Sequence, residues 1–521
     1  GYKRFKANEG NYIFLGSNRR LSANLNLIAD DGTGFQIYTN DSTEALRDLT
    51  VGFNQIDLAQ VTRVIPYMPR MGGKLNGDMH LIRTNTETSI SSAIGLQNFS
   101  YEGCPMGDLG SEFIYMPKGD GTHYVNGTLT CNDREVSTLE GTYNAKSNDI
   151  KAQLALEKTP LRLINGFIPQ QIIGFRGTGD GTLSVKGNVA KPLVDGEIML
   201  DSAYLFSEPY GVEMRFDNDP VRIVGSHLLF ENFEMHSHNN STLISNGELD
   251  FSDPSQMRLD LRMRADKFLL IDSKQTRRSE AFGKAYVNFA ARIKGPVSNL
   301  NMLGKLDVLG STDMTYVLKD SPLSTDNQLE GLVKFTDLNN PGATHVERPA
   351  PSGFTMDMTI NVDQAAHVVC MLNADQSNYI DIEGGGTLRM VYNPIDDMRL
   401  TGRYTLNNGE MKYSLPVIPL KTFNIQDGSY IEFRGDPMNP RLNITALEEV
   451  RAEVTGSGDQ TRTVLFNCGV EITKTLNDMG LTFVISAPED LTLNSELQTM
   501  SKEERGKIAV TMLTTGMYLA D

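Results

Sequence analysis

Apolar and polar residues alternate through nearly the whole chain of 521 residues. Residues 258–266 read RLDLRMRAD, which puts Leu259, Leu261 and Met263 in one set and charged residues in the other. Successive side chains of a β-strand point to opposite faces, so this pattern predicts a strand with one apolar and one polar face. The same alternation occurs at residues 149–157, 181–187, 387–393, 429–435, 441–447 and 481–486. The sequence therefore predicts an all-β protein.

Turns and a few short helices are expected between the strands. Clusters of glycine, asparagine and aspartate favour turns, and residues 406–411 (LNNGEM) form one such predicted turn. Helical spacing of apolar residues predicts short helices within residues 57–69 and 160–170. A third helix is predicted at residues 501–519, where Ser501 and a glutamate three residues later match a capping box.

Two short sequence motifs recur at intervals of about 100 residues. The glycines, valines and aliphatic residues of 187–200 recur at 295–308, with a constant offset of 108. The predicted helix at 57–69 recurs at 160–170 with an offset of 103. This period is too long for the common short solenoid repeats and indicates a repeated sheet module. We expect one elongated β-structure over residues 1–521, with approximate modules 1–175, 176–290, 291–400 and 401–500, and the C-terminal helix.

A sheet with one apolar face has to cover that face. The predicted helices are too few to do so over the whole chain. The sheet must therefore pack on another sheet, close into a barrel, or curl and leave a groove lined with apolar side chains. A large exposed apolar surface is typical of a ligand or partner site.

Composition excludes several classes of function. The formal net charge of −17 disfavours binding to nucleic acid and simple electrostatic binding to an anionic bilayer. No run of 18 apolar residues is present, so no membrane-spanning helix is predicted. The four cysteines are Cys104, Cys131, Cys370 and Cys468. A Cys104–Cys131 disulfide is possible, but we favour small buried apolar residues.

Catalytic and metal-binding patterns are weak. No GxSxG, HExxH or Walker motif occurs. Glu234, His236 and His238 could share one strand face and bind a metal, but a solvated polar face explains them more simply. We therefore predict no catalytic residues, no metal and no cofactor, and a protein that is not an enzyme. A polysaccharide-degrading parallel β-helix would show coils of about 20 to 25 residues, whereas the periods here are near 100.

Three stretches together resemble the TamB family of translocation and assembly modules, within the AsmA-like superfamily. They are GTLSVKGNVAKPLVDGEIMLDSAYL, ARIKGPVSNLNMLGKLDVLGSTDMTYVLKDSPLS and GSYIEFRGDPMNPRLNITALEEVRAEV. Residues 484–516 resemble the C-terminal segment of the family, a strand followed by a helix. The sequence is most similar to the form of the family from Bacteroidota.

The resemblance implies a long, curled, antiparallel-type sheet that forms an elongated apolar groove, like a taco shell. It implies a conduit that moves phospholipid through the periplasm of a Gram-negative bacterium and supports outer-membrane biogenesis. It also implies an inner-membrane anchor outside this chain, and a TamA-like outer-membrane barrel protein of the insertase superfamily as partner near the C-terminal end. The predicted lipid-groove residues are Leu183, Val185, Ile198, Leu200, Leu259, Leu261, Met263, Leu306, Val308, Leu388 and Met390.

Two other functions stay open at this point. An extended structural or adhesive β-protein would show the same alternation, because alternation does not tell a closed core from an open groove. A chaperone-like scaffold for outer-membrane protein assembly would also use a long apolar surface.

Overall fold

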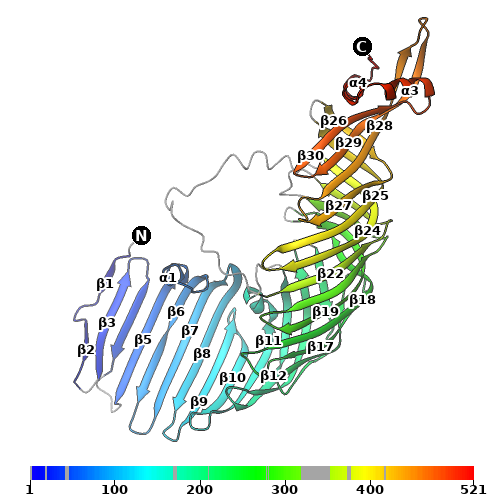
Figure 1. Cartoon of the computed structure of the whole chain (residues 1–521). Coiled ribbons are helices and arrows are strands. Elements are labelled where there is room, and N and C mark those ends of the chain that lie inside the picture. The colour runs from blue at the N-terminus through cyan, green and yellow to red at the C-terminus, as the bar shows by residue number, and fades with distance from the viewer. Residues whose placement is uncertain are drawn as a thin grey trace. The chain divides into compact units, whose positions relative to one another are not determined.

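The structure is a computed structural model that describes residues 3–17, 20–40, 46–167, 173–208, 211–276, 279, 281–317, 353–371, 377–415 and 418–520. Strands dominate these residues, and hydrogen bonds join them in a sheet of 30 strands, which confirms the all-β prediction (Figure 1). The chain divides into two compact units. Unit 1 comprises residues 1–207, 214–235 and 245–261, and unit 2 comprises residues 208–213, 236–244 and 262–521. The finer modules predicted from the sequence stay a prediction.

The N-terminal elements are β1 (Phe5–Ala7), β2 (Tyr12–Leu15), β3 (Leu21–Ala29), β4 (Gly34–Thr39), β5 (Arg47–Asp57), α1 (Leu58–Val64), β6 (Met71–Arg83), β7 (Thr88–Tyr101), β8 (Cys104–Pro117), β9 (Thr122–Cys131), β10 (Arg134–Asn144), β11 (Asp149–Pro160), the 3₁₀ helix η1 (Leu161–Phe167), β12 (Gly174–Asn188) and β13 (Leu193–Ser207). The next strands are β14 (Val212–Phe216), β15 (Val221–Val224), β16 (His227–His236), β17 (Thr242–Asp250) and β18 (Arg258–Ser273).

The remaining elements are β19 (Ala281–Pro296), β20 (Asn301–Val308), β21 (Asp313–Val317), β22 (Thr355–Val362), β23 (His367–Met371), β24 (Tyr379–Asn393), β25 (Asp397–Leu415), β26 (Ile418–Ile425), β27 (Ser429–Gly435), β28 (Arg441–Thr455), β29 (Thr461–Thr475), β30 (Asp478–Ser486), α3 (Leu491–Thr499) and α4 (Lys502–Thr515). Every segment that the alternation predicted to be a strand lies in one of these strands.

Unit 1 is built mainly by neighbouring strands that pair in chain order. From β3 to β13, each strand pairs antiparallel with the next, so the chain runs up and down across the sheet. Such short connections place residues that are near in sequence side by side, and between the bulges that shift the register, alternate side chains share one face.

The repeat at an offset of 108 is a repeated hairpin. In β12–β13 Leu183 lies opposite Gly196, and in β19–β20 Ala291 lies opposite Gly304, so the register is the same after the offset. The strand before each turn carries a glycine with a positive φ, Gly187 at 93° in the first hairpin. Side chains other than glycine rarely adopt this conformation, which explains why the glycine is part of the repeated phrase.

Each of the two turns also contains an equivalent backbone hydrogen bond. The amide of Lys191 donates to the carbonyl of Asn188 at 3.0 Å, and the amide of Asn299 donates to the carbonyl of Pro296 at 2.8 Å. Both bonds span three residues, as in a β-turn. The sequence repeat therefore encodes both the register and the turn.

The repeat at an offset of 103 is a helical turn between paired strands. α1 follows β5, and its first turn is capped by Asp57, whose carboxylate accepts a hydrogen bond from the amide of Ala59 at 3.0 Å. η1 follows β11 and is a 3₁₀ helix rather than the predicted α-helix. Asn165 uses its side chain to bond both the amide and the carbonyl of Phe175 instead of supporting a longer helix.

Unit 2 departs from the antiparallel pattern at one junction. β20 and β21 both pair antiparallel with β19, but β22 pairs parallel with β20, and β23 pairs parallel with β21. A parallel pair needs a long return connection, and residues 318–352, which lie outside the described residues, stand at that point of the chain. From β24 onward the described pairs are antiparallel.

The turn predicted at residues 406–411 is wrong, because these residues lie inside β25. Leu406 pairs with Gly384 and Gly409 pairs with Ile382, with a bulge between the two pairs. Gly409 takes a φ of 149°, and a side chain there would meet the backbone of β24. Asparagine and glycine in this strand therefore mark a bulge and a close approach of backbones rather than a turn.

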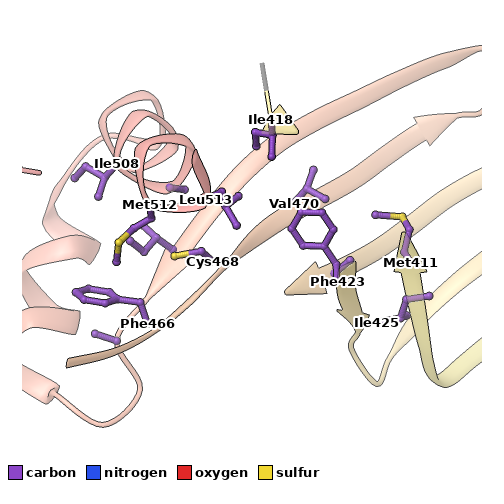
Figure 2. Close-up of a cluster of buried hydrophobic side chains, with 14 of the residues drawn as sticks. Met411, Ile418, Phe423, Ile425, Phe466, Cys468, Val470, Ile508, Met512 and Leu513 are labelled. Carbon is purple, nitrogen blue, oxygen red and sulfur yellow. The ribbon is translucent and has the colours of Figure 1, made fainter. Parts of the chain in front are cut away.

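The main hydrophobic core lies at the C-terminal end of unit 2, where α4 packs on β29, β30 and β26 (Figure 2). The predicted C-terminal helix is confirmed as α4. Ser501 and Glu504 form the expected capping box, and the helix ends at Gly516 with a φ of 74°. The sequence did not reveal α3, whose N-cap Asp490 also forms an ion pair of 2.8 Å with Arg462 on β29.

Candidate functional site

The predicted groove residues of β12 and β13 lie on one face of unit 1. Leu183 lies opposite Gly196, Val185 opposite Val194, and Ile198 opposite Gly181. Directly opposed residues of an antiparallel pair point to the same side of the sheet. Leu200, two residues from Ile198, therefore shares this side, and all four predicted residues are half-buried.

This apolar surface continues across the preceding strands. Leu139 of β10 lies opposite Leu154 of β11, which lies opposite Leu183 of β12. Leu139 keeps 40% of its surface exposed. The intervening positions carry polar side chains such as Gln153, which lies opposite Ser184. We call the aliphatic side the unit 1 apolar face, defined by Leu139, Leu154, Leu183, Val185, Val194, Ile198 and Leu200.

The predicted residues of β18 also alternate as expected. Leu259, Leu261 and Met263 are half-buried, whereas Arg262 and Arg264 between and beyond them are exposed. The strand therefore separates an apolar row from a charged row.

The predicted residues of β20 and β24 share one face of unit 2, and β22 joins them. Leu306 pairs with Ile360 of β22, and Ile360 pairs with Leu388 of β24. Val308 and Met390 lie two residues from Leu306 and Leu388, so they point to the same side. We call this side the unit 2 apolar face, defined by Phe289, Leu306, Val308, Met358, Ile360, Leu388 and Met390.

The unit 2 apolar face leads along β24 into a cavity of about 180 Å³. Ile380 and Ile382 of β24 line the cavity. They lie an even number of residues from Leu388 and Met390, so they point to the same side of the strand. We call the cavity the C-terminal pocket. It is lined by Cys370, Ile380, Ile382, Met411, Tyr413, Ile425, Ile431, Phe433, Pro437, Met438, Pro440, Leu442, Ile444, Ile472, Leu476, Met479 and Leu481.

The titratable groups in and near the C-terminal pocket are a thiol and two phenols, and burial raises the pKa of each. Desolvation raises the pKa of the Cys370 thiol to about 11 and also raises the pKa of Tyr413. Burial, with a smaller contribution from Cys370, raises the pKa of nearby Tyr404 to about 12, and its hydroxyl donates to the carbonyl of Gly384 at 3.1 Å. A pocket with these groups suits apolar atoms rather than ions.

The opposite face of the same strands is polar and carries ion pairs. Arg389 binds Asp357 on the neighbouring strand at 2.7 Å, and the hydrogen bond from Arg389 holds the pKa of the Asp357 carboxyl below its usual value. Arg434 binds Glu432 at 2.8 Å on β27. The sheet of unit 2 is therefore amphipathic, with its charges on the side away from the apolar face.

Beyond the C-terminal pocket, α4 covers the apolar side of the sheet. Figure 2 shows Met512 and Leu513 of α4 beside Cys468, with Phe466 and Val470 on the same strand. Leu513, Phe466 and Val470 are each 0% exposed. Fully burying one such side chain stabilises the fold by about 1.5–3 kcal/mol. This end is a protein core rather than an open surface.

The structure answers two smaller questions from the sequence. β16 ends at His236 and His238 is exposed beyond it, so Glu234, His236 and His238 do not form one row of a strand. All four cysteines are free thiols, and Cys104, Cys131 and Cys468 are buried, as expected for small apolar residues. The sulfur of Cys131 accepts a hydrogen bond from Arg162 of η1 at 3.0 Å rather than bonding to Cys104.

Sequence reasoning missed the residues of the C-terminal pocket. The segment 429–435 was predicted as a strand, and its alternation already puts Ile431 and Phe433 on one side. The missing information was which strands meet there, because the pocket combines residues from β23 to β30.

No helix within the described ranges is both long and apolar enough to cross a membrane. The family model described as the TamB C-terminal domain matches residues 231–516, which is more than half of the chain. No curated protein matches the chain in sequence.

Proposed function

We propose, from the premise that this chain belongs to the TamB C-terminal domain family, that it is a non-enzymatic conduit for phospholipid. Proteins of this family belong to the envelope of Gram-negative bacteria and act in the context of outer-membrane assembly. In the proposal, acyl chains lie along the apolar faces of units 1 and 2 while head groups stay in water. The full-length protein acts in the periplasm, with its C-terminal end near a TamA-like outer-membrane barrel protein.

One observation carries the proposal: in each unit the strand registers align aliphatic side chains on one face across three neighbouring strands. In unit 2 the row runs from Leu306 through Ile360 to Leu388 without a polar residue in those positions. In unit 1 it runs from Leu139 through Leu154 to Leu183. Leu388 is 8% exposed, but Leu306 and Ile360 in unit 2 and Leu154 and Leu183 in unit 1 keep more of their surface exposed. Exposed aliphatic surface of this kind is typical of a site for an apolar ligand or partner.

The physical advantage of such a surface is large for a lipid. Each CH₂ group removed from water contributes about 0.8 kcal/mol, so a diacyl lipid crosses an aqueous space only with its chains shielded. Neighbouring positions on the apolar faces offer similar aliphatic contacts. No single position then binds strongly enough to hold the lipid in place, and movement along the row stays possible.

The test is native mass spectrometry of the purified chain with analysis of the extracted lipids. The variant Leu306→Asp places a charge in the aliphatic row, and we expect it to lower the bound phospholipid several-fold. The matched control is Thr359→Asp. Thr359 is exposed on the opposite face, where its strand partners are Lys305 and Arg389, so an aspartate there meets positive charge.

Phospholipid that is lost in Leu306→Asp and retained in Thr359→Asp supports the conduit. A wild-type chain that is folded and free of lipid would contradict it and favour a structural protein whose apolar faces are covered by protein.

A further inference from the structure

We infer that the C-terminal pocket binds the end of a single alkyl chain and is the last lipid position on the unit 2 apolar face. This inference rests on the proposed function, since it names what one part of the conduit holds. It assigns a distinct role to the stretch between the unit 2 apolar face and the core beneath α4.

The lining of the C-terminal pocket selects for hydrocarbon. Its walls are isoleucines, leucines, methionines, prolines and one phenylalanine, and none of its lining residues is charged. The two lining groups with a titratable atom, Cys370 and Tyr413, are neutral at physiological pH, and burial raises both pKa values further. A phosphate or an ammonium group would be desolvated there without a partner, so a lipid head group is excluded.

The size of the pocket fits part of a chain rather than a whole lipid. Its volume is about 180 Å³. Apolar cavities of about 150 Å³ remain dry and accept a molecule the size of benzene, whereas pockets for complete drug-sized ligands measure about 300–1,000 Å³. The terminal methylenes of one acyl chain match the smaller class.

The entrance to the pocket is continuous with the proposed lipid path. Ile380 and Ile382 in the pocket and Leu388 and Met390 of the unit 2 apolar face all occupy even positions of β24, so they lie along one side of one strand. The bulge in this region adds a residue to β25, not to β24, and does not interrupt the row. Between Leu388 and Ile382 this side of β24 carries only Gly384 and Gly386, so an acyl chain that lies on the partly exposed Met390 is aligned with the pocket.

The far side of the pocket is closed by the protein itself. Met411 and Ile425 line the pocket, and Met411 lies opposite Phe423, which is 0% exposed in the core that α4 completes (Figure 2). The next part of the apolar side is thus already occupied by side chains of α4. A chain end that enters the pocket stops there.

The loop after β27 gives the pocket a deformable edge. Pro437 and Met438 line the pocket, and Met438 keeps 45% of its surface exposed. A methionine side chain is unbranched and polarizable, so it can move to accommodate chain ends of different shape.

The absence of tryptophan from the chain allows a clean optical test. The variant Phe433→Trp places a single tryptophan in the pocket. The control Tyr430→Trp lies on the same strand but on the opposite face, where the guanidinium of Arg403 stacks 3.9 Å from the ring of Tyr430. Each variant of the 521-residue chain is mixed with phosphatidylcholine brominated either near the chain end or near the head group, because bromine quenches tryptophan only on close contact.

We expect chain-end bromine to quench Phe433→Trp at least twofold more than head-group bromine does, with little quenching of Tyr430→Trp. Adding Ile431→Phe, which fills the pocket with an apolar ring, is expected to reduce that quenching by half or more. Circular dichroism confirms that each variant keeps its sheet.

Two results would overturn the inference in different ways. If Leu306→Trp is quenched and Phe433→Trp is not, lipid lies on the open row but not in the pocket, and the conduit stands without this site. If neither position is quenched and no lipid is extracted from the wild-type chain, the conduit and the pocket both fail.

Discussion

The unit 1 apolar face and the surface beneath α4 have the same strand pattern but different surroundings. On the unit 1 apolar face, Leu154 and Leu183 are half-buried and Leu139 is 40% exposed. Beneath α4, Phe466 and Val470 are completely buried. Both rows consist of alternate residues on antiparallel strands. α4 buries the second row completely, whereas the short helix η1 reaches only part of the first, where Leu161 lies near Leu200.

This comparison shows that a single sheet can be used in two ways. Where α3 and α4 cover it, the apolar side stabilises the fold. On the unit 1 apolar face, Leu139, Leu154 and Leu183 keep part of their surface exposed, and this surface can meet an apolar ligand. Substitutions beneath α4 should therefore lower the stability of the fold more than equivalent substitutions on the unit 1 apolar face.

The largest loss of stability is expected beneath α4. Leu513 is 0% exposed, so Leu513→Ala leaves a cavity and should cost about 2–5 kcal/mol. Hydrogen exchange followed by mass spectrometry would show faster exchange in α4 and β29. Unchanged exchange in these elements would mean that α4 does not depend on this core.

A smaller loss is expected for the matching change on the unit 1 apolar face. Leu183 is half-buried, so Leu183→Ala should cost about 1 kcal/mol, roughly half the value of a fully buried leucine. The same exchange measurement on β12 checks this value in lipid-free protein. An effect as large as that of Leu513→Ala would show that the unit 1 face is a closed core.

Cysteine reactivity offers a third way to compare covered and open surfaces. Burial raises the pKa of Cys468 to about 12, and the thiolate is the reactive form, so this thiol should resist alkylation at pH 8 in the native protein. Cys468 lies beneath α4, and Leu513→Ala should accelerate its alkylation at least tenfold by loosening the helix. Peptide mapping identifies the labelled thiol, and an unchanged rate at Cys468 would contradict the proposed cover.

The smallest effect is expected on the polar side of unit 2. His367 lies 2.9 Å from Asp313 and also hydrogen-bonds to Asp381, so it links β21, β23 and β24. Burial of the ring favours the neutral form, but these two carboxylates outweigh it and raise the pKa of His367 above its ordinary value of 6.5. The stabilisation is complete below pH 6.5 and is lost as the pH rises through the raised pKa.

Thermal unfolding at pH 5.5 and pH 8.5 measures this contribution. The wild-type chain should lose more stability than His367→Gln over this interval, with a difference of about 1 kcal/mol or less because the ring is partly exposed. Equal pH dependence of the two proteins would show that His367 does not contribute.

Much of the fold could be predicted because it is encoded locally. Alternation located the strands, and the glycine and its turn in residues 187–200 and 295–308 encoded a hairpin with the same register in both places. The rest depends on distant contacts. Local patterns did not indicate that β22 would pair parallel with β20, because residues far apart in the chain decide that pairing.

Part of the candidate site could also be predicted from local patterns, and part could not. Leu306 and Leu388 could be assigned to an apolar row, since each alternates with polar neighbours. The sequence did not show that Ile360 lies between Leu306 and Leu388. It also did not show the C-terminal pocket, because the pocket combines residues from several strands. The Asn-Gly pair within residues 406–411 predicted a turn because a bulge needs the same residue types as a turn.

The most direct test of the central claim is photo-crosslinking in cells that make the full-length protein. A benzophenone amino acid replaces Leu183 or Leu306 on the apolar faces, and Ser184 or Thr359 on the opposite faces serves as the matched control. We predict phospholipid adducts, detected by mass spectrometry, at Leu183 and Leu306 and not at the two controls. Adducts at all four positions, or at none of them, would contradict the account that lipid covers the apolar faces.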